Sequence, residues 1–155
     1  MNYASAASLT NQRLDIARRF ILQGSSEDTQ WMGPAYENAA LFHLQSAVNG
    51  LLQEIIQGYQ LGVSIRYADV LLHAKKRGIV LPVLTELENL LAQPTSWLCQ
   101  LNKAYDACFE CHSAMPIAGA SNIIVSGGDA GAATQYYLNS LTDLVLRFRE
   151  ESAEY

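Results

Sequence analysis

The chain has 155 residues, enough for one domain with a sizeable core, and 50% of them are hydrophobic while only 16% are charged. This composition excludes disorder over most of the chain and indicates that part of the surface is covered by a protein partner or by a second copy. The formal net charge is -5, and the basic residues are scattered rather than gathered on one face, so a nucleic-acid-binding function is not favoured.

The first eight residues contain neither a basic segment nor an apolar segment, so we expect no secretory signal. No apolar run approaches the ~20 residues that a membrane-spanning helix needs. The three cysteines are an odd number, which a reducing compartment explains better than a disulfide framework does. The sequence therefore predicts a cytoplasmic protein with no membrane-embedded part.

The first predicted helix runs from Ser5 to Gln23, with Gly24 as its C-terminal stop. Arg13 falls on the apolar stripe of this helix, where it is expected to extend toward solvent or to pair with a carboxylate of another helix.

The second predicted helix, from Pro34 to Gln57, has the longest and clearest apolar stripe in the sequence. Pro34 suits the first turn of a helix, where its missing N–H costs nothing. Three small residues, Ala39, Ser46 and Gly50, lie on this helix and would admit a neighbouring helix closely.

Three shorter helices are predicted next. The first is capped by Ser64 and ends at Arg77, and the second covers Pro82 to Ala92. The third begins after Thr95 or Ser96 and ends at about His112. Glycines and a proline predict a long loop over residues 114–131, in which Asn122 to Val125 reads as a short extended piece. The last predicted helix runs from about Ala132 to Ser152. Together these elements predict an all-α fold in a single domain of residues 1–155, a four-helix-type bundle with additional short helices and one long glycine-containing loop.

The string Cys108-Phe109-Glu110-Cys111-His112 has the C-x-x-C-H spacing of c-type haem attachment. Three observations argue against haem. No export signal is predicted, both cysteines lie on a core stripe, and a long stretch of chain follows the motif. Zinc is the other candidate, because Cys108, Cys111 and His112 would share one helix face. Structural zinc sites draw their ligand pairs from turns, however, and no second pair exists here. We therefore interpret the cysteines as packing residues and predict no cofactor, with Cys108, Cys111 and His112 as the alternative metal or haem ligands.

Arg66 and His73 are seven residues apart and would lie on one face of the predicted third helix. The pair resembles the R-x(4–6)-H signature of the HEPN superfamily, helical proteins that include metal-independent ribonucleases. That resemblance implies that Arg66 steadies a phosphate and that His73 takes part in proton transfer. Because the acidic net charge argues against an RNA substrate, two polar residues on a solvated helix edge are the preferred interpretation, and the ribonuclease is kept as an alternative function.

Other catalytic signatures are missing from the sequence: it has no Glu-x-x-His pair, no H-E-x-x-H, no P-loop and no G-x-G-x-x-G. His43 lies beside the apolar stripe of the second helix and is expected to be a hydrogen-bonded core histidine. The three histidines are spread over three predicted helices, so the sequence alone assembles no catalytic constellation.

Four segments together resemble a small family of uncharacterised helical proteins from Pseudomonas-like gammaproteobacteria. The resemblance follows the same order along nearly the whole chain, and its residues are Thr10-Asn11-Gln12, Ala39 to Leu44 with Glu54-Ile55, Ser96-Trp97-Leu98 with Ala104-Tyr105, and Leu144 to Glu150. The family is a domain of unknown function, so the resemblance implies kinship and no activity. The sequence as a whole predicts a non-enzymatic, cytoplasmic helical protein that acts through protein–protein contacts, among them self-association.

Overall fold

The protein is seen in a computed structural model that describes residues 5–26, 31–62, 64–110 and 120–154, with residues 120–130 described by their backbone alone. The described residues form six α-helices and no strand, which confirms the predicted all-α fold. The helices are α1 (Ala6–Ser25), α2 (Met32–Gly58), α3 (Tyr67–Lys76), α4 (Pro82–Ala92), α5 (Trp97–Ala107) and α6 (Ala120–Ala153).

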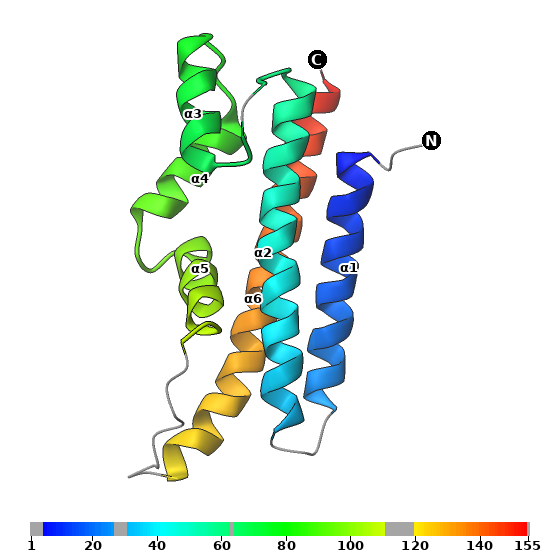
Figure 1. The fold of residues 1–155 in the computed structure, drawn as a ribbon, viewed down its shortest axis with the longest axis vertical. Coiled ribbons are helices and arrows are strands. Elements are labelled where there is room, and N and C mark those ends of the chain that lie inside the picture. The colour runs from blue at the N-terminus through cyan, green and yellow to red at the C-terminus, as the bar shows by residue number, and fades with distance from the viewer. Residues whose placement is uncertain (1–4, 27–30, 63, 111–119, 155) are drawn as a thin grey trace.

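Three long helices, α1, α2 and α6, run side by side (Figure 1). The chain runs in the same direction along α2 and α6 and in the opposite direction along α1. The three short helices lie on the side of α2 away from α1, and both α4 and α5 contact α6. These two short helices therefore follow one another along the position that a fourth long helix would occupy in a four-helix bundle.

The break between α4 and α5 follows from Pro94, because a proline disfavours helical geometry in the residue before it and Gln93 is extended (φ -106°, ψ 109°). Ser96 joins the two helices across the break. Its hydroxyl donates to the carbonyl oxygen of Leu90 in α4 (2.5 Å) and accepts from the backbone N–H of Cys99 in α5 (3.2 Å). The N-terminal cap predicted for this helix is thus confirmed at Ser96.

The core is built around α2, as its apolar stripe predicts. Leu44, Leu51 and Ile55 of α2 are fully buried, and they belong to the same cluster as Leu101 of α5 and Leu141 of α6. Each fully buried large aliphatic side chain contributes roughly 1.5–3 kcal/mol. This cluster is therefore the main source of stability in the bundle.

The small residues predicted to admit a neighbour mark the place where α1 packs on α2. A methyl group added at Gly50 would lie 2.5 Å from Oγ1 of Thr10, which is fully buried on α1. Arg13 donates to the hydroxyl of Ser46 instead of pairing with a carboxylate, so its predicted partner is wrong. The stripe of small residues thus allows the two helices to approach closely.

Gly24 was expected to end the first helix, but α1 continues through it to Ser25. A Cβ at Gly24 would lie 3.2 Å from Cβ of Tyr36. This glycine therefore serves the close approach of α1 and α2, and the expected stop at this position is wrong.

The third helix begins at Tyr67 rather than after Ser64, and its N-cap residue is Arg66. Ser64 does not cap the helix, because its hydroxyl donates to the carboxylate of Asp69 instead (2.6 Å). The helix ends as expected before Gly78, whose φ of 67° lies in the left-handed region that glycine adopts without strain.

The glycine-containing loop predicted for residues 114–131 is wrong from Ala120 onward, because this part of the chain is the first section of α6. The same holds for the extended piece expected at Asn122 to Val125, which is helical. Each glycine disfavours a helix by about 1 kcal/mol, but extension of a helix that already exists adds one hydrogen bond for each further residue. The part of α6 anchored in the core provides that existing helix, and residues 114–119 lie outside the described chain.

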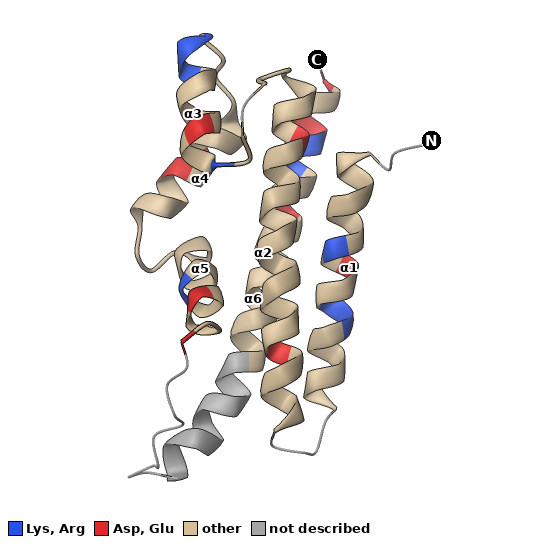
Figure 2. Ribbon diagram, viewed as in Figure 1, with Lys and Arg blue, Asp and Glu red and all other residues tan. Residues whose placement is uncertain are grey.

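The charges of the protein are unevenly placed along its helices (Figure 2). From Asn38 to Gln53, α2 contains no Asp, Glu, Lys or Arg.

In the described part of the chain, we find no helix with both the length and the apolar character needed to cross a membrane.

Gly50→Ala tests the close approach of α1 and α2. We expect it to lower the free energy of unfolding by about 1–3 kcal/mol, because the added methyl group collides with a buried side chain. Gly58→Ala is the matched control, since a Cβ at this α2 glycine meets nothing within 4 Å. It should leave stability unchanged or raise it by up to about 1 kcal/mol. Urea denaturation measures both variants.

The collision also predicts a rescue. In a Thr10→Ala background the nearest atom, Oγ1, is removed, so Gly50→Ala should cost less there than in the wild-type protein. Equal costs in the two backgrounds would contradict the contact between Gly50 and Thr10.

Candidate functional site

The two residues of the predicted ribonuclease pair do not share a helix. Arg66 precedes the first residue of α3 and has extended backbone geometry (φ -103°, ψ 126°), whereas His73 lies in the last turn. The expectation that both side chains lie on one helix face is therefore wrong, because that expectation requires Arg66 to be helical.

His73 lines a surface hollow of about 200 Å³ together with Ser64, Asp69, Leu72 and Lys76. Arg66 is exposed and is not part of this lining. Within the described residues nothing brings the guanidinium of Arg66 to the imidazole of His73. Catalysis by Arg66 and His73 stays a prediction.

The predicted metal or haem ligands are only partly within the described chain. The fifth helix ends at Ala107 instead of His112, because the backbone tightens there: Cys108, Phe109 and Glu110 donate to carbonyl oxygens three residues earlier. Cys108 is thus at the end of the helix, and Cys111 and His112 lie outside the described residues. Over the ranges that the structure covers, no three His, Cys, Asp or Glu side chains gather as a metal site would need.

The surroundings of Cys108 are those of an unreactive thiol. Its sulfur lies 3.4 Å from Oδ1 of Asn38 and 3.4 Å from the carbonyl oxygen of Ala104. Burial raises the pKa of the Cys108 thiol, and the negative charge of Glu37 adds to that increase. Since the thiolate is the nucleophile and the metal ligand, this environment favours the packing role.

Glu37 is a carboxyl group between α2 and α6 that the sequence analysis did not single out. Burial raises its pKa, and a hydrogen bond from the Thr134 hydroxyl (3.4 Å) opposes that shift without cancelling it. Its charge also raises the pKa of the Tyr137 hydroxyl, after the larger effect of burial. Glu37, Cys108 and Tyr137 therefore form a group whose neutral forms are all favoured.

His43 belongs to an aromatic cluster that joins α1 to α2. Its ring stacks on Phe20 of α1 (centroids 5.6 Å apart) and meets Phe42 edge to face (5.2 Å). Burial lowers the pKa of His43, and the cation of Arg13 lowers it further. The expected hydrogen bond is not found at Nδ1, which is buried without a partner among the described residues. His43 is therefore an aromatic packing residue.

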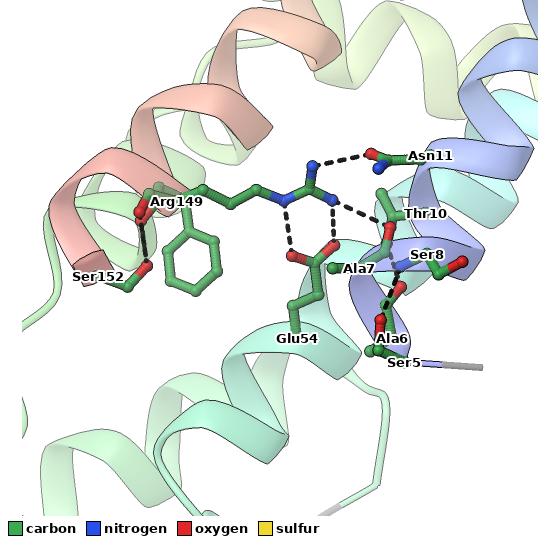
Figure 3. A network of polar contacts seen from close by, with 10 residues as sticks. Ser5, Ala6, Ala7, Ser8, Thr10, Asn11, Glu54, Arg149 and Ser152 are labelled. Carbon is green, nitrogen blue, oxygen red and sulfur yellow. Dashed lines mark hydrogen bonds and ion pairs between the residues drawn. The ribbon is translucent and has the colours of Figure 1, made fainter. Parts of the chain in front are cut away.

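The strongest polar cluster joins three helices around Arg149 of α6 (Figure 3). Its guanidinium donates from Nε and Nη2 to the two carboxylate oxygens of Glu54 in α2 (3.0 and 2.9 Å). It also donates to Oδ1 of Asn11 (2.8 Å) and to the carbonyl oxygen of Ala7 (3.2 Å), both in α1. The side chain of Glu54 is only 7% exposed and that of Arg149 is 27% exposed.

This cluster is structural, because the guanidinium has five N–H groups and four of its hydrogen bonds already go to the protein. The N–H groups that remain are too few to bind a substrate anion through two parallel hydrogen bonds, which is the geometry that arginine favours. In the sequence, Asn11, Glu54 and Arg149 stand out only as part of the family resemblance. The sequence feature that could have indicated this cluster is the carboxylate of Glu54, because it directly precedes the buried Ile55 and a buried carboxylate needs a cation from another helix.

Arg149→Lys tests this clamp. The ammonium group of lysine cannot donate the two parallel hydrogen bonds that the guanidinium donates, so the carboxylate of Glu54 would be left buried with an incomplete partner. We therefore expect a loss of about 2–4 kcal/mol in the free energy of unfolding. Arg147→Lys is the matched control on the same helix. Arg147 pairs with Glu86 in solvent, and exposed pairs contribute about 0–1 kcal/mol. Comparable losses in the two variants would contradict the clamp.

Glu37→Gln tests the buried carboxyl group. The folded protein holds this proton more tightly than the unfolded chain does, so ionisation of Glu37 opposes folding. The variant should therefore have a higher melting temperature than the wild type at pH 7. That gain should shrink as the pH falls from 7 toward the ordinary glutamate value of 4.5, and it should be absent below that value, where Glu37 is protonated in both states. Glu150→Gln, at an exposed position on α6, is the control and should show no such pH-dependent gain.

Comparisons with known proteins agree with the resemblance read from the sequence. A family of unknown function, DUF6586, matches residues 1–155. Neither the curated proteins nor the solved structures contain a match to this chain. Because the family match covers the whole chain, the chain belongs to the family of unknown function DUF6586.

Proposed function

We propose that this protein is a non-enzymatic helical protein of the bacterial cytoplasm that acts through protein–protein contacts, and that its first partner is a second copy of itself. The observation that supports this most is an exposed, uncharged surface on the first turns of α2. Its residues are Trp31, Ala35, Asn38 and Phe42, here called the α2 strip.

The α2 strip exposes large aromatic area to solvent. Trp31 is 74% exposed and Phe42 is 52% exposed, while Ala35 and Asn38 beside them are also exposed. The ring of Phe42 is held from the side by His43, so it is partly ordered before any partner binds. Aromatic side chains are enriched at the centre of protein interfaces.

A second copy fits this surface better than a different partner does. The net charge of -5 makes two copies repel each other, and an interface free of charged groups avoids the strongest part of that repulsion. A two-fold interface must also be complementary to itself. An axis that crosses α2 midway between Ala35 and Asn38 would place Trp31 opposite Phe42 of the second copy, and Ala35 opposite Asn38 of the second copy.

Other described features are consistent with a binding protein rather than an enzyme. The guanidinium of Arg149 is used by Glu54, Asn11 and Ala7, and the pKa of Cys108 is raised rather than lowered. Cys99 and Cys108 are free thiols, which supports a reducing compartment such as the cytoplasm.

Phe42→Glu tests the proposal, because it would place two like charges at the two-fold interface. We expect the wild-type protein to have the mass of a dimer in light scattering coupled to size exclusion, and Phe42→Glu to have the mass of a monomer with an unchanged circular dichroism spectrum. Phe109→Glu makes the same chemical change at a phenylalanine that is 68% exposed near the end of α5, and it should remain a dimer. A wild-type protein that stays monomeric at all concentrations, or a dimer that survives Phe42→Glu, would overturn the proposal.

A further inference from the structure

Arg13 carries a positive charge that the described chain does not neutralise. It lies on α1, is half-buried, and donates from Nη1 to the hydroxyl of Ser46 in α2. In the described part of the chain, its guanidinium has no other hydrogen bond and no ion pair. Asp15, the acidic residue nearest to it in the sequence, is engaged by Arg18 and Arg19. Because a guanidinium has five N–H groups, most of those on Arg13 remain for solvent or for a molecule from outside the chain.

Other arginines of the described chain show what Arg13 lacks. Arg149, whose side chain is 27% exposed, donates two hydrogen bonds to the carboxylate of Glu54. Arg77 donates to two backbone carbonyl oxygens just after α2. Arg66 is exposed, so water solvates its charge. Arg13 combines partial burial with an uncompensated charge, a combination that costs free energy unless an anion meets it.

The charge of Arg13 acts on its neighbour His43. Burial lowers the pKa of His43 first and the cation of Arg13 lowers it further, and no carboxylate opposes these two effects. Between Asn38 and Gln53, α2 supplies no charged side chain either. The contact between α1 and α2 therefore carries a local positive charge here, in a protein whose net charge is -5.

Ser46 adds a further donor at the same point. Its oxygen accepts from Arg13, and its O–H has no acceptor among the described residues. Ser46 follows Phe42 by about one turn of α2, so the pair of Arg13 and Ser46 borders the α2 strip. A carboxylate has two oxygens and about four lone-pair positions, so it can accept from two guanidinium N–H groups and from a hydroxyl at once.

We propose that Arg13 and Ser46 bind a carboxylate group, to which the guanidinium donates two parallel hydrogen bonds and the Ser46 hydroxyl donates a third. A phosphate dianion is disfavoured, because one guanidinium neutralises one charge and the net charge of -5 repels the other. The carboxylate belongs either to a free small molecule or to the second copy that docks on the α2 strip. Only the second source rests on the proposed self-association.

Acetate, acetamide and chloride separate the parts of this proposal. Acetate has a charge and two oxygens, acetamide has a similar shape without the charge, and chloride has the charge alone. Each is titrated at pH 7 and constant ionic strength into full-length Trp31→Glu labelled with ¹⁵N. This variant places like charges at the far end of the α2 strip, so it is a monomer in which no second copy covers Arg13.

Backbone amide signals near Arg13 and Ser46 give the affinity for each probe, and the ring signals of His43 give its pKa. We expect acetate to bind at least 5-fold more tightly than acetamide or chloride. Bound acetate should also raise the pKa of His43, because it offsets the charge of Arg13.

Variants in the same Trp31→Glu background test the two donors. Arg13→Lys keeps the charge but cannot donate two parallel hydrogen bonds, so it should weaken acetate binding at least 5-fold. Ser46→Ala removes one donor and should weaken binding about 3–10-fold, and it tests the site even if Arg13→Lys fails to fold. Arg147→Lys is the matched control at an exposed arginine, and it should leave acetate binding unchanged.

Titration of the protein without Trp31→Glu identifies the source of the carboxylate. If the second copy supplies it, the dimer should bind acetate at least 5-fold more weakly than Trp31→Glu does, and Arg13→Lys should shift the mass toward that of a monomer. If a free molecule supplies it, both proteins should bind acetate equally and Arg13→Lys should leave the mass unchanged.

The binding of acetate to Trp31→Glu decides the proposal. The absence of saturable shifts with acetate, or equal affinities for acetate and chloride, would overturn it. Acetate binding that is unchanged in both Arg13→Lys and Ser46→Ala would overturn it as well. Since acetate binding and the mass in solution are measured separately, a wild-type protein that is monomeric overturns the self-association and leaves the carboxylate site to its own test.

Discussion

The packing of α1 against α2 is the constraint on which the rest of the bundle depends. At Gly50 the two helices are so close that one methyl group would collide with Thr10. One turn further along α2, the buried carboxylate of Glu54 receives the guanidinium of Arg149 from α6, which in turn holds Asn11 and Ala7 of α1. The close approach places these groups within hydrogen-bonding distance, so packing and the clamp fix the same three helices in one arrangement. A wider spacing of α1 and α2 would leave Glu54 buried without its full set of partners.

The chemistry of the described residues follows from this arrangement. Groups that are reactive in other proteins are here held in unreactive states: the Cys108 thiol by burial and by the charge of Glu37, and His43 by burial and by Arg13. His73 lines a surface hollow together with Asp69 and Lys76. The interior of the bundle therefore serves mainly to hold the helices in place. The proposed self-association therefore rests on a surface, the α2 strip, and not on the interior.

Half of the α2 strip, Asn38 and Phe42, belongs to the uncharged stretch of α2 from Asn38 to Gln53. A helix that is surrounded by others needs apolar residues on several sides, and α2 packs against α1, α3, α5 and α6. Polar positions within this stretch are occupied by amides, a serine and a histidine instead of charges. Amides tolerate partial burial better than charges do, and each has both a donor and an acceptor.

The sequence by itself determined the helical class, the apolar stripe of α2, the small residues on α2 that admit a neighbouring helix, the helix from Pro82 to Ala92 and a cap at Thr95 or Ser96, because these depend on residues close together in the chain. Only the tertiary structure decided where several helices begin and end. Arg66 lies before the first residue of α3 and Cys108 follows the last residue of α5, so neither residue has the place inside a helix that its predicted motif assumed. Residues from Ala120 are helical although their glycines predict a loop, because they extend a helix that the core already holds. The clamp of Asn11, Glu54 and Arg149 joins residues from three different helices, and no local pattern contains that information.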